Sequence, residues 1–271
     1  MKKKEERKTS AKWNAADYAA NSVVQQTWAR ELIARLNLHG DEHILDVGCG
    51  DGKVTAEISR AVPHGSTTGI DASAEMIAFA KETFAGKKFP NLEFYVTDAR
   101  DIHFARRFDV VFSNAALHWV DNHEKFLQGA GSALKSGGRL VVSCGGKGNA
   151  HDVFVAMRPE LRQKRWRAYF RKMPTAYFFY APDDYKKWLP KFGFKALTVH
   201  LADKDANYPG AKGFAAWLRT TWIPYAQRVP EDLREEFIAA VTDRYVAKHP
   251  PDADGKVHVK MVRLEIDARK T

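Results

Sequence analysis

Cysteine is scarce in this sequence, with only Cys49 and Cys144 among its 271 residues. Two cysteines cannot form a disulfide framework, and their spacing is not that of a metal site. We therefore expect both to be small, buried packing residues, and we expect no metal in the protein.

Long apolar runs are also missing. No stretch of about 18 consecutive apolar residues occurs, as a membrane-spanning helix would require. The N-terminal residues MKKKEER lead into polar residues rather than into the apolar segment of a secretory signal. We therefore expect a cytoplasmic protein that does not insert into membranes. A length of 271 residues with 45% hydrophobic content suits one large domain with an accessory element.

The excess of positive charge is confined to two segments. The net charge is +10, of which residues 1–12 carry +4 and residues 158–172 carry +6. The first segment is predicted to be a disordered, solvated tail. The second interleaves basic residues with Trp166, Tyr169 and Phe170 and is predicted to be a helix. This helix either rests its aromatic face on the domain or lines a substrate entrance that attracts an anion.

The stretch HILDVGCGDGK, residues 43–53, joins an apolar strand to a glycine-rich turn. Its apolar residues suit a parallel strand that is buried on both faces, and residues 54–61 continue at helical spacing. Gly48, Gly50 and Gly52 have no Cβ and permit positive φ, so the turn can wrap a small molecule above the helix N-terminus. A purely structural tight turn is the alternative.

The spacing of the glycines indicates which small molecule binds. A dinucleotide-binding turn has the pattern G-x-G-x-x-G, whereas here the third glycine comes one residue early. The pattern D-x-G-x-G-x-G, which begins at Asp46, resembles the first motif of class I S-adenosylmethionine-dependent methyltransferases. Asp71 ends the next predicted strand, 19 residues beyond Gly52. The resemblance implies that S-adenosylmethionine is the cofactor and that the Asp71 carboxylate accepts hydrogen bonds from its ribose hydroxyls.

The resemblance also implies an α/β fold, with a Rossmann-like, seven-stranded, mostly parallel sheet whose last strand is antiparallel. Helices are expected on both faces of the sheet, together with a helical cap. We divide the chain into a disordered basic tail, 1–12, and one methyltransferase domain, 13–271. Within the domain we expect an N-terminal lid helix, a cofactor-binding core and a two-part helical substrate cap: residues 13–40, residues 41–145, and residues 146–192 with 203–255.

Further cofactor contacts are expected where the second and third strands end. Ser73 suits the N-cap of the helix after Asp71, and Met76 in that helix is either a core residue or a contact of the adenine. The resemblance implies that the carboxylate of Asp98 accepts a hydrogen bond from the adenine amino group, with Asp101 as the alternative. The explanation without a cofactor contact is that Asp98 is an ordinary helix-capping residue. The cofactor-binding residues implied by the resemblance are Tyr18, Asp46, Gly48, Cys49, Gly50, Asp71, Ala72, Met76, Asp98, Ala99, Asn114 and Trp119.

The loop after the fourth predicted strand is SNAALHWV, residues 113–120. Ligands in open α/β sheets bind beyond the carboxyl ends of the strands, so this loop is expected to face the acceptor. Enzymes that methylate the amino groups of nucleic-acid bases carry an N/D-P-P-Y type segment here, and this loop has no proline. It instead resembles the N-A-A-L-H/Q-W-V segment of trans-aconitate and juvenile hormone acid methyltransferases, which esterify small carboxylates. The likeness covers nearly all of residues 13–268, with the sixth and last strands predicted at 196–200 and 259–266.

Methylation of a carboxylate needs little catalytic machinery. A carboxylic acid has a pKa of about 4, so it is ionised at neutral pH and no general base is needed. Gln25 or Gln26 and the Trp119 indole are predicted to position the carboxylate, and Tyr18 to contact the sulfonium. His118 is then structural, or it is the base if the acceptor is an amine, phenol or carbon acid. The predicted substrate-binding residues are Tyr18, Gln25, His118, Arg167 and Trp217.

Several alternatives for the acceptor and the function stay open. The trans-aconitate pattern more often has glutamine at the position of His118, which leaves the identity of the acid open. The cap binds either a second anionic group or a long apolar acid, and an acyl group on an acidic carrier protein is another kind of acceptor. A non-catalytic cofactor-binding or RNA-associated protein is the alternative outside enzymes, although we expect no nucleic acid and no obligate protein partner. The candidate anion-binding arginines are Arg158, Arg162, Arg165, Arg167 and Arg219.

Overall fold

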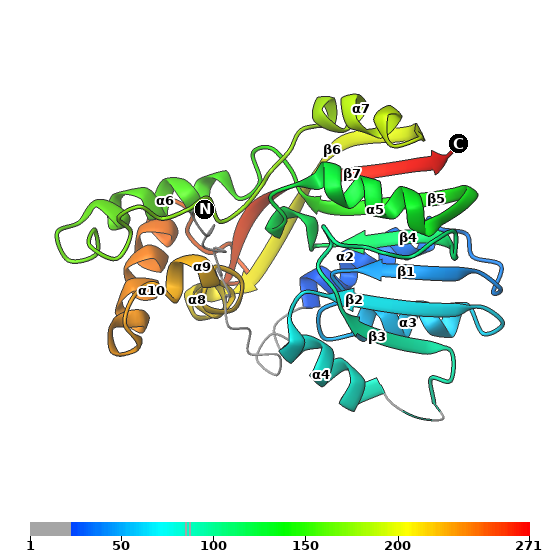
Figure 1. The fold of residues 1–271 in the computed structure, drawn as a ribbon. Coiled ribbons are helices and arrows are strands. Elements are labelled where there is room, and N and C mark those ends of the chain that lie inside the picture. The colour runs from blue at the N-terminus through cyan, green and yellow to red at the C-terminus, as the bar shows by residue number, and fades with distance from the viewer. Residues whose placement is uncertain (1–22, 85, 87) are drawn as a thin grey trace, which may run out of the picture.

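A seven-stranded sheet forms the centre of the computed structural model, which describes residues 23–84, 86 and 88–271 (Figure 1). The strand order is β3-β2-β1-β4-β5-β7-β6; β7 is antiparallel to both of its neighbours, and the other paired strands are parallel. The predicted Rossmann-like sheet is therefore confirmed. The predicted basic tail and Tyr18 lie outside the described residues. The strands are β1 (His43–Val47), β2 (Ser66–Asp71), β3 (Leu92–Val96), β4 (Phe108–Asn114), β5 (Leu134–Gly145), β6 (Phe194–Pro209) and β7 (Lys256–Lys270).

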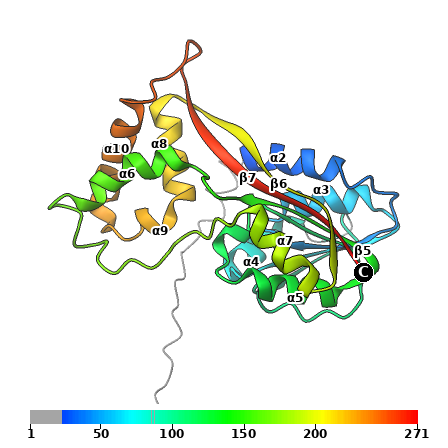
Figure 2. The ribbon, with the colours of Figure 1, turned by 90° about the horizontal axis from the view of Figure 1, so that it is seen from above.

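The central strands are buried because helices cover both faces of the sheet (Figure 2). Along β1, Leu45 and Val47 belong to the core that α5 and α7 cover, while Ile44 belongs to the core that α2 and α3 cover. All three side chains are fully buried. This is the continuous apolar run that a parallel strand covered on both faces requires. The helices of this half are α2 (Val23–Ala34), α3 (Lys53–Ala61), α4 (Ala74–Phe84), α5 (His123–Ala133) and α7 (Pro182–Lys191).

β6 and β7 continue past the rest of the sheet into a second lobe, where they carry the cap helices (Figure 2). Their far ends pack with these helices in a separate apolar core that includes Tyr208, Phe214, Trp217 and Tyr245. The cap therefore rests on two strands that also belong to the main sheet. The cap helices are α6 (His151–Arg162), α8 (Gly210–Thr221), α9 (Ile223–Ala226) and α10 (Glu231–Val246).

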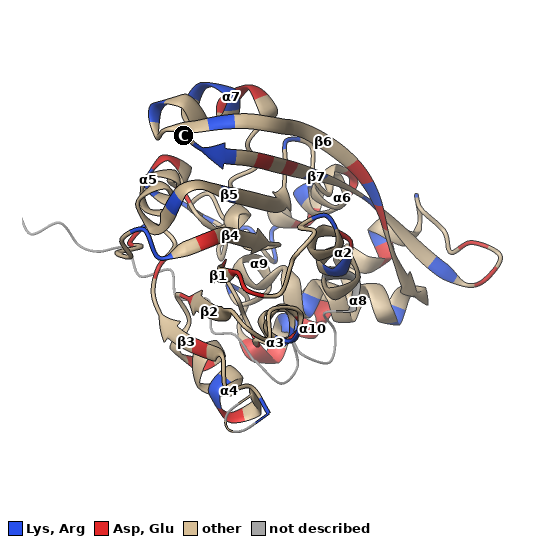
Figure 3. Cartoon of the chain, turned by 90° about the vertical axis from the view of Figure 1, so that its right-hand side faces the viewer, with Lys and Arg blue, Asp and Glu red and all other residues tan. Residues whose placement is uncertain are grey.

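Both C-terminal strands are longer than predicted. The predicted ranges, 196–200 and 259–266, cover only parts of β6 and β7. Residues 203–209, which are predicted to belong to the cap, pair in register with residues 256–262. Charged residues of both signs follow this exposed edge strand, so in the sequence it looks like a solvated loop (Figure 3). Charges on an edge strand are a common protection against pairing with other chains.

The basic segment 158–172 is only partly helical. α6 ends at Arg162, and the chain continues in turns to Lys172, which has a positive φ of 54°. Trp166 is nevertheless buried, and its ring packs edge-on against Phe237 of α10 at a centroid distance of 5.6 Å. This aromatic side chain therefore rests on the domain, as the first of the two interpretations predicts, but the expected continuous helix is wrong.

Within the described residues, nothing indicates a disulfide, a membrane-spanning helix or a metal site. Cys49 and Cys144 are both buried free thiols, as predicted. Within the ranges that the structure describes, no helix is long and apolar enough to cross a bilayer. The same part of the chain holds no group of three or more His, Cys, Asp or Glu side chains placed to bind a metal ion.

Candidate functional site

The glycine-rich turn follows β1 and is held by the neighbouring strand β2. The backbone N–H groups of Gly48 and Cys49 both donate to the carbonyl of Ile70, at 2.7 and 3.0 Å. Gly48 and Gly50 have φ values of 77° and 54°, which L-residues rarely adopt. A Cβ at Gly48 would lie 2.1 Å from the Cβ of Ala116. The turn therefore depends on glycine both for its conformation and for its contact with the loop after β4.

Asp71 closes the turn from the end of β2. Its carboxylate accepts hydrogen bonds from the Gly50 N–H at 3.0 Å and from the Ser73 N–H at 2.8 Å. Burial raises the pKa of Asp71, and these two donors oppose the effect. Ser73 caps α4, since its Oγ accepts from the Met76 N–H at 3.2 Å. The predicted N-cap is confirmed, and the Asp71 carboxylate is fixed against the glycine turn.

Three carboxylates, those of Asp46, Asp71 and Asp98, lie close together where β1, β2 and β3 end. Besides burial, the charge of Asp71 raises the pKa of Asp46 and the charge of Asp98 raises that of Asp71, because the groups are close enough to repel one another. Arg100 donates to Asp98 through Nε and Nη2, at 2.9 and 2.6 Å, and these bonds lower the pKa of Asp98. Asp101, the alternative to Asp98, is exposed.

Asp46 is the most deeply buried of these carboxylates, with 2% of its surface exposed. Thr55 of α3 donates to its Oδ2 at 2.8 Å. Burial raises the pKa of Asp46 to about 7 in spite of this hydrogen bond. An acid whose pKa is higher in the folded than in the unfolded chain destabilises the fold as the pH rises.

We expect the Asp46→Asn variant to gain stability over the wild type as the pH rises. Between 3.8, its ordinary pKa, and about 7, folded Asp46 holds a proton that the unfolded chain releases, so wild-type stability falls through this window. Asparagine does not titrate, and the free-energy advantage of the variant should grow by up to roughly 4 kcal/mol between about pH 4 and about pH 8. Urea unfolding of the cofactor-free protein at a series of pH values measures this difference.

Asp109→Asn is the matched control for this titration. Although burial raises it, the hydrogen bonds from Lys135 and from the His43 N–H leave the pKa of Asp109 lower than usual. The ionised carboxylate of Asp109 therefore stabilises the fold fully at any pH above the ordinary carboxyl pKa of about 4. This stabilisation is lost only in more acidic solution. The Asp109→Asn difference should stay nearly constant where the Asp46→Asn difference grows. If the difference in unfolding free energy from the wild type stayed constant with pH for both variants, the raised pKa of Asp46 would be contradicted.

The loop after β4 directs two aromatic side chains toward a cavity. Near the end of β4, Ser113 Oγ donates to the carbonyl of Val47 at 2.8 Å, so the loop leaves the strand beside the glycine turn. In the short 3₁₀ helix η1 (Leu117–Trp119), Leu117 is buried in the core, whereas His118 and Trp119 line the cavity. The cavity has a volume of about 50 Å³, enough for a few water molecules. Its aromatic walls are Trp28, His118, Trp119, Tyr177, Phe179, Tyr208, Trp217 and Trp222.

His118 is a neutral imidazole in this cavity. Its Nδ1 accepts from the Gly145 N–H at 3.4 Å, so the ring proton belongs on Nε2. Burial, and after it the positive charge of Arg263, lowers the pKa of His118 to about 3. His118 can therefore donate a hydrogen bond through Nε2, but it is a weak base near neutral pH.

α2 contributes Trp28 to the cavity rather than a glutamine. Gln26 donates to Glu57 Oε1 of α3 at 2.6 Å. Residues two apart on a helix project about 200° apart, so Gln26 and Trp28 leave α2 on opposite sides. The structure thus places Gln26 at the contact of α2 with α3, which corrects its predicted positioning role. The side chains of Gln25 and Tyr18 lie outside the described residues.

A second, open cavity of about 550 Å³ lies beside the first. Tyr177 and Phe179 line both cavities, so their rings form a partition. Arg167, which is predicted to bind substrate, lines the second cavity and not the first. Two other candidate arginines, Arg165 and Arg219, form ion pairs with acids of α10. The basic segment therefore does not reach the cavity beside His118.

The remaining predicted cofactor contacts differ in how far they are buried. Met76 is 3% exposed, as a core residue would be, and Ala99 packs against the main core. Ala72 is exposed next to Asp71. Asn114, at the end of β4, accepts a hydrogen bond from Arg263 at 3.1 Å.

Arg263 itself is the residue that sequence reasoning missed. It lies on β7, only 3% of its surface is exposed, and it lines the cavity together with His118 and Trp28. In the sequence it is one of several charged residues that alternate with apolar residues along β7, next but one to Glu265. Lys260, Glu265 and Asp267 are flanked by apolar residues in the same way, so no local signal in the sequence distinguishes the buried Arg263 from them.

Comparison with known proteins decides the family. The sequence model of a methyltransferase domain matches residues 38–176, just over half of the chain. Trans-aconitate 2-methyltransferase of Rhodopseudomonas palustris strain BisA53 is 31% identical over 273 aligned residues, which cover 96% of this chain and 100% of the relative. The chain belongs to the class I S-adenosylmethionine-dependent methyltransferases. S-adenosylmethionine is accordingly the methyl donor of this methyltransferase, as predicted.

Solved structures share the fold of this methyltransferase at low sequence identity. The YcgJ protein of Bacillus subtilis superposes with a TM-score of 0.61 at 18% identity, over 89% of this chain and 97% of that one. Phosphoethanolamine N-methyltransferase 2 of Haemonchus contortus, solved with S-adenosylhomocysteine, superposes with a TM-score of 0.56 at 17% identity, over 90% of this chain and 52% of that one. At such identities the likeness is one of fold and does not indicate the acceptor.

Proposed function

We propose that this methyltransferase transfers a methyl group to a carboxylate oxygen of a small acid. The observation that carries the proposal is the half-buried imidazole of His118 in the wall of the cavity, whose Nδ1 accepts from the Gly145 N–H and whose pKa is lowered to about 3. An acceptor bound there has to arrive deprotonated, because so weak a base cannot remove its proton efficiently. Carboxylates are deprotonated at neutral pH, whereas phenols and alkyl ammonium groups are not. The relative at 31% identity is named for such an acid, trans-aconitate.

The same proposal places the cofactor at the edge where β1, β2 and β3 end. Asp71, fixed by the Gly50 and Ser73 N–H groups, is positioned to accept from the ribose hydroxyls, and Asp98 to accept from the adenine amino group. When bound, S-adenosylmethionine supplies an electrophilic methyl group. Because Gly48 has no side chain, the turn can pack against Ala116 of the loop after β4, beside the proposed cofactor site. The other proposed cofactor contacts are Asp46, Cys49, Ala72, Met76, Ala99, Asn114 and Trp119.

His118 and Trp119 are proposed to orient the reacting carboxylate. The Nε2–H of His118 and the indole N–H of Trp119 are neutral donors on neighbouring residues of η1. Neutral donors fix the direction of an oxygen lone pair without neutralising its charge. The oxygen can then approach the methyl carbon in line while keeping its nucleophilicity.

Incubation with isotopically labelled cofactor and a panel of acids tests the proposed reaction. The panel contains di- and tricarboxylates, fatty acids and carrier-bound acyl groups, with a reaction lacking any acid as the background control. We expect label to enter a small acid and to be released by mild base, as from an ester. A labelled product that resists base would overturn the proposal, since N-methyl and C-methyl groups are not cleaved in this way.

We expect the His118→Gln variant to methylate its carboxylate acceptor within about threefold of the wild-type kcat/KM, because glutamine keeps an N–H donor. His118→Ala removes the donor and should lower kcat/KM by about 2- to 10-fold, the effect of one neutral hydrogen bond. The wild-type kcat/KM should also stay level through pH 6.5, the ordinary pKa of histidine. A loss of several hundredfold in both variants, with normal cofactor binding, would instead identify His118 as a general base.

A further inference from the structure

We propose that His123 is a positioning residue of the methyl transfer, which fixes the carbonyl of Leu117 and thereby holds the short helix η1 at the wall of the cavity. The hydroxyl of Tyr185 keeps the imidazole in the orientation that this requires. The inference rests on the proposed carboxylate methylation for the reaction that is measured. It gives a role to two buried side chains, those of His123 and Tyr185, that do not themselves line the cavity.

The imidazole of His123, the first residue of α5, lies between η1 and α7. Its Nε2 is 2.7 Å from the carbonyl oxygen of Leu117, and its Nδ1 is 2.6 Å from the hydroxyl oxygen of Tyr185. Leu117 and Tyr185 are fully buried, and only 1% of the surface of His123 is exposed. A buried donor or acceptor is unfavourable without a partner, so each of these polar groups depends on the next.

These two contacts determine the tautomer of His123. A backbone carbonyl can only accept a hydrogen bond, so the proton of the neutral ring lies on Nε2 and is donated to Leu117. Nδ1 then carries a lone pair and accepts from the Tyr185 O–H. Burial lowers the pKa of His123 to about 4 and raises that of Tyr185, so the ring is neutral and the phenol protonated near neutral pH. One hydrogen bond therefore runs from α7 to α5, and the next from α5 to η1.

η1 needs such an external contact because it is a single 3₁₀ turn. Two backbone hydrogen bonds close it, from the Trp119 and Val120 N–H groups to the carbonyls three residues earlier, at 3.0 and 2.9 Å. Bonds of this kind have poorer geometry than those of an α-helix. The turn also follows Ala115, whose φ of 57° is unfavourable for an L-residue. A backbone of this kind persists only where the surrounding structure determines it.

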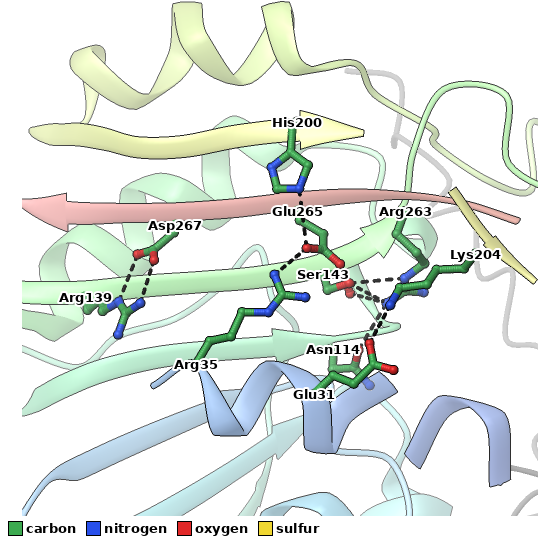
Figure 4. A network of polar contacts seen from close by, with 10 residues as sticks. All are labelled: Glu31, Arg35, Asn114, Arg139, Ser143, His200, Lys204, Arg263, Glu265 and Asp267. Carbon is green, nitrogen blue, oxygen red and sulfur yellow. Dashed lines mark hydrogen bonds and ion pairs between the residues drawn. The ribbon is translucent and has the colours of Figure 1, made fainter. Parts of the chain in front are cut away.

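Two further contacts hold the loop after β4 on either side of the carbonyl that His123 binds. Where the loop begins, Asn114 accepts from Arg263 of β7 at 3.1 Å (Figure 4). Further along, the carbonyl of His118 accepts from the Phe178 N–H at 2.9 Å. Between these points, His123 supplies its hydrogen bond from inside the main core, so the position of η1 follows the packing of α5 and α7.

A shift of η1 is expected to act on the reaction more than on cofactor binding. His118 and Trp119 line the cavity from η1. Asp71 and Asp98, the proposed contacts of the ribose and the adenine, lie instead where β2 and β3 end. A misplacement of about 1 Å among reacting groups can lower the rate by about 100-fold. Loss of the hydrogen bond from His123 should therefore lower kcat while the cofactor Kd changes little.

His123→Met and His123→Gln form the matched pair that tests this assignment. Methionine and glutamine have unbranched side chains of equal length, but only glutamine has an N–H donor for the Leu117 carbonyl. Turnover is expressed per site that binds S-adenosylhomocysteine in calorimetry, so unfolded protein is not counted. We expect His123→Met to lower kcat by about 10- to 100-fold and His123→Gln by less than about fivefold. The cofactor Kd of both variants should stay within about twofold of the wild-type value.

Hydrogen exchange measures the mobility of η1 directly and needs no acceptor. The backbone amides of residues 115–121 are compared with those of β5 in the same molecule. In His123→Met the ratio of the two exchange rates should rise, and in His123→Gln it should stay near the wild-type ratio. An unchanged ratio in His123→Met would overturn the assignment.

Tyr185→Phe removes only the hydroxyl that orients the ring, and Tyr245→Phe is its control. Tyr245 is also buried and donates to the carbonyl of His258 at 2.8 Å, but it belongs to the apolar core of the cap. We expect kcat per binding site to fall by about 3- to 10-fold in Tyr185→Phe and by less than about twofold in Tyr245→Phe.

Long-range ¹H–¹⁵N NMR correlations test the tautomer of His123, whose signals are identified by their absence from the spectrum of His123→Gln. We expect a protonated Nε2 and an unprotonated Nδ1 at neutral pH. A proton on Nδ1 would overturn the assignment, because Nε2 could then not donate to Leu117.

The remaining outcomes separate positioning from a purely structural role. If His123→Met is less stable but turns over normally per binding site, or if it loses no more kcat than His123→Gln, the assignment is overturned. If neither His123 variant folds, Tyr185→Phe decides, and a kcat equal to that of Tyr245→Phe overturns the assignment.

Failure of the proposed function is recognised separately. Turnover is measured with whichever acceptor the labelled-cofactor panel identifies. A base-resistant product overturns the carboxylate reaction, and the ratio of the His123→Met and His123→Gln rates still decides the role of His123. If no acceptor is methylated, the proposed function fails, and hydrogen exchange in the same pair of variants decides whether His123 fixes η1.

Discussion

Replacing Gly48 with alanine is expected to lower the free energy of unfolding by about 2 to 4 kcal/mol and to abolish measurable cofactor binding. The new Cβ would lie 2.1 Å from the Cβ of Ala116, and the φ of 77° is unfavourable for any L-residue. Relief of the contact requires a shift of the glycine turn or of the loop after β4. Both border the proposed cofactor site, so stability and binding should fall together in urea unfolding and in calorimetry.

Gly137→Ala is the matched control for Gly48→Ala. Gly137 has a similar φ of 75°, but no atom lies within 4 Å of the position its Cβ would take. Gly137→Ala has the same unfavourable φ as Gly48→Ala but creates no steric contact. We therefore expect the free energy of unfolding to fall by about 1 kcal/mol and the cofactor affinity to stay normal. If the two variants lost equal stability, the contact with Ala116 would not be the cause.

Asp71→Ala is expected to weaken S-adenosylmethionine binding by about 1.5 to 3 kcal/mol, which is about 10- to 150-fold in Kd. The variant loses the carboxylate proposed to accept from the ribose. It also removes the acceptor of the Gly50 and Ser73 N–H groups, which hold the turn and the start of α4. Calorimetric titration with the cofactor, at a pH where the wild type is stable, measures the change in Kd.

Two further variants separate the carboxylate of Asp71 from general electrostatics. Asp71→Asn keeps a side-chain oxygen for the Gly50 N–H and should weaken binding less than Asp71→Ala. Asp101→Ala removes an exposed carboxylate from the same edge of the sheet and should leave the affinity unchanged. Unchanged affinity in Asp71→Ala would refute the ribose assignment. An equal loss of affinity in Asp101→Ala would mean that the overall negative charge of this edge of the sheet, and not the position of Asp71, determines cofactor binding.

The arrangement of the proposed cofactor site could be predicted because its signals are local. The spacing of Gly48 and Gly50 requires a turn with positive φ, and Ser73 marks the start of a helix whichever way the rest of the chain folds. Strands β1, β2 and β3 are parallel and lie in the order β3-β2-β1, so their carboxyl ends share one edge. Residues that follow such strands converge even though they are distant in the sequence.

The C-terminal half was harder to predict because burial there depends on partners that are distant in the chain. The outer part of β6 is charged because one of its edges is exposed, and only pairing with β7 shows that it is a strand. The arginines of residues 158–172 form a dense cluster that is prominent in the sequence. The structure nevertheless directs Arg167 to the second cavity and ties Arg165 to α10.

The sequence by itself determined the fold class, the cofactor and the edge of the sheet where we propose that it binds, because these follow from short-range spacing and from the geometry of parallel strands. Only the tertiary structure decided which side chains line the cavity beside the loop after β4. The cavity brings Trp28 of α2 against Arg263 of β7, and the supporting pair, Arg35 and Glu265, is 230 residues apart in the chain. A side chain becomes buried only when the covering element is in place, and no local pattern records which element that is.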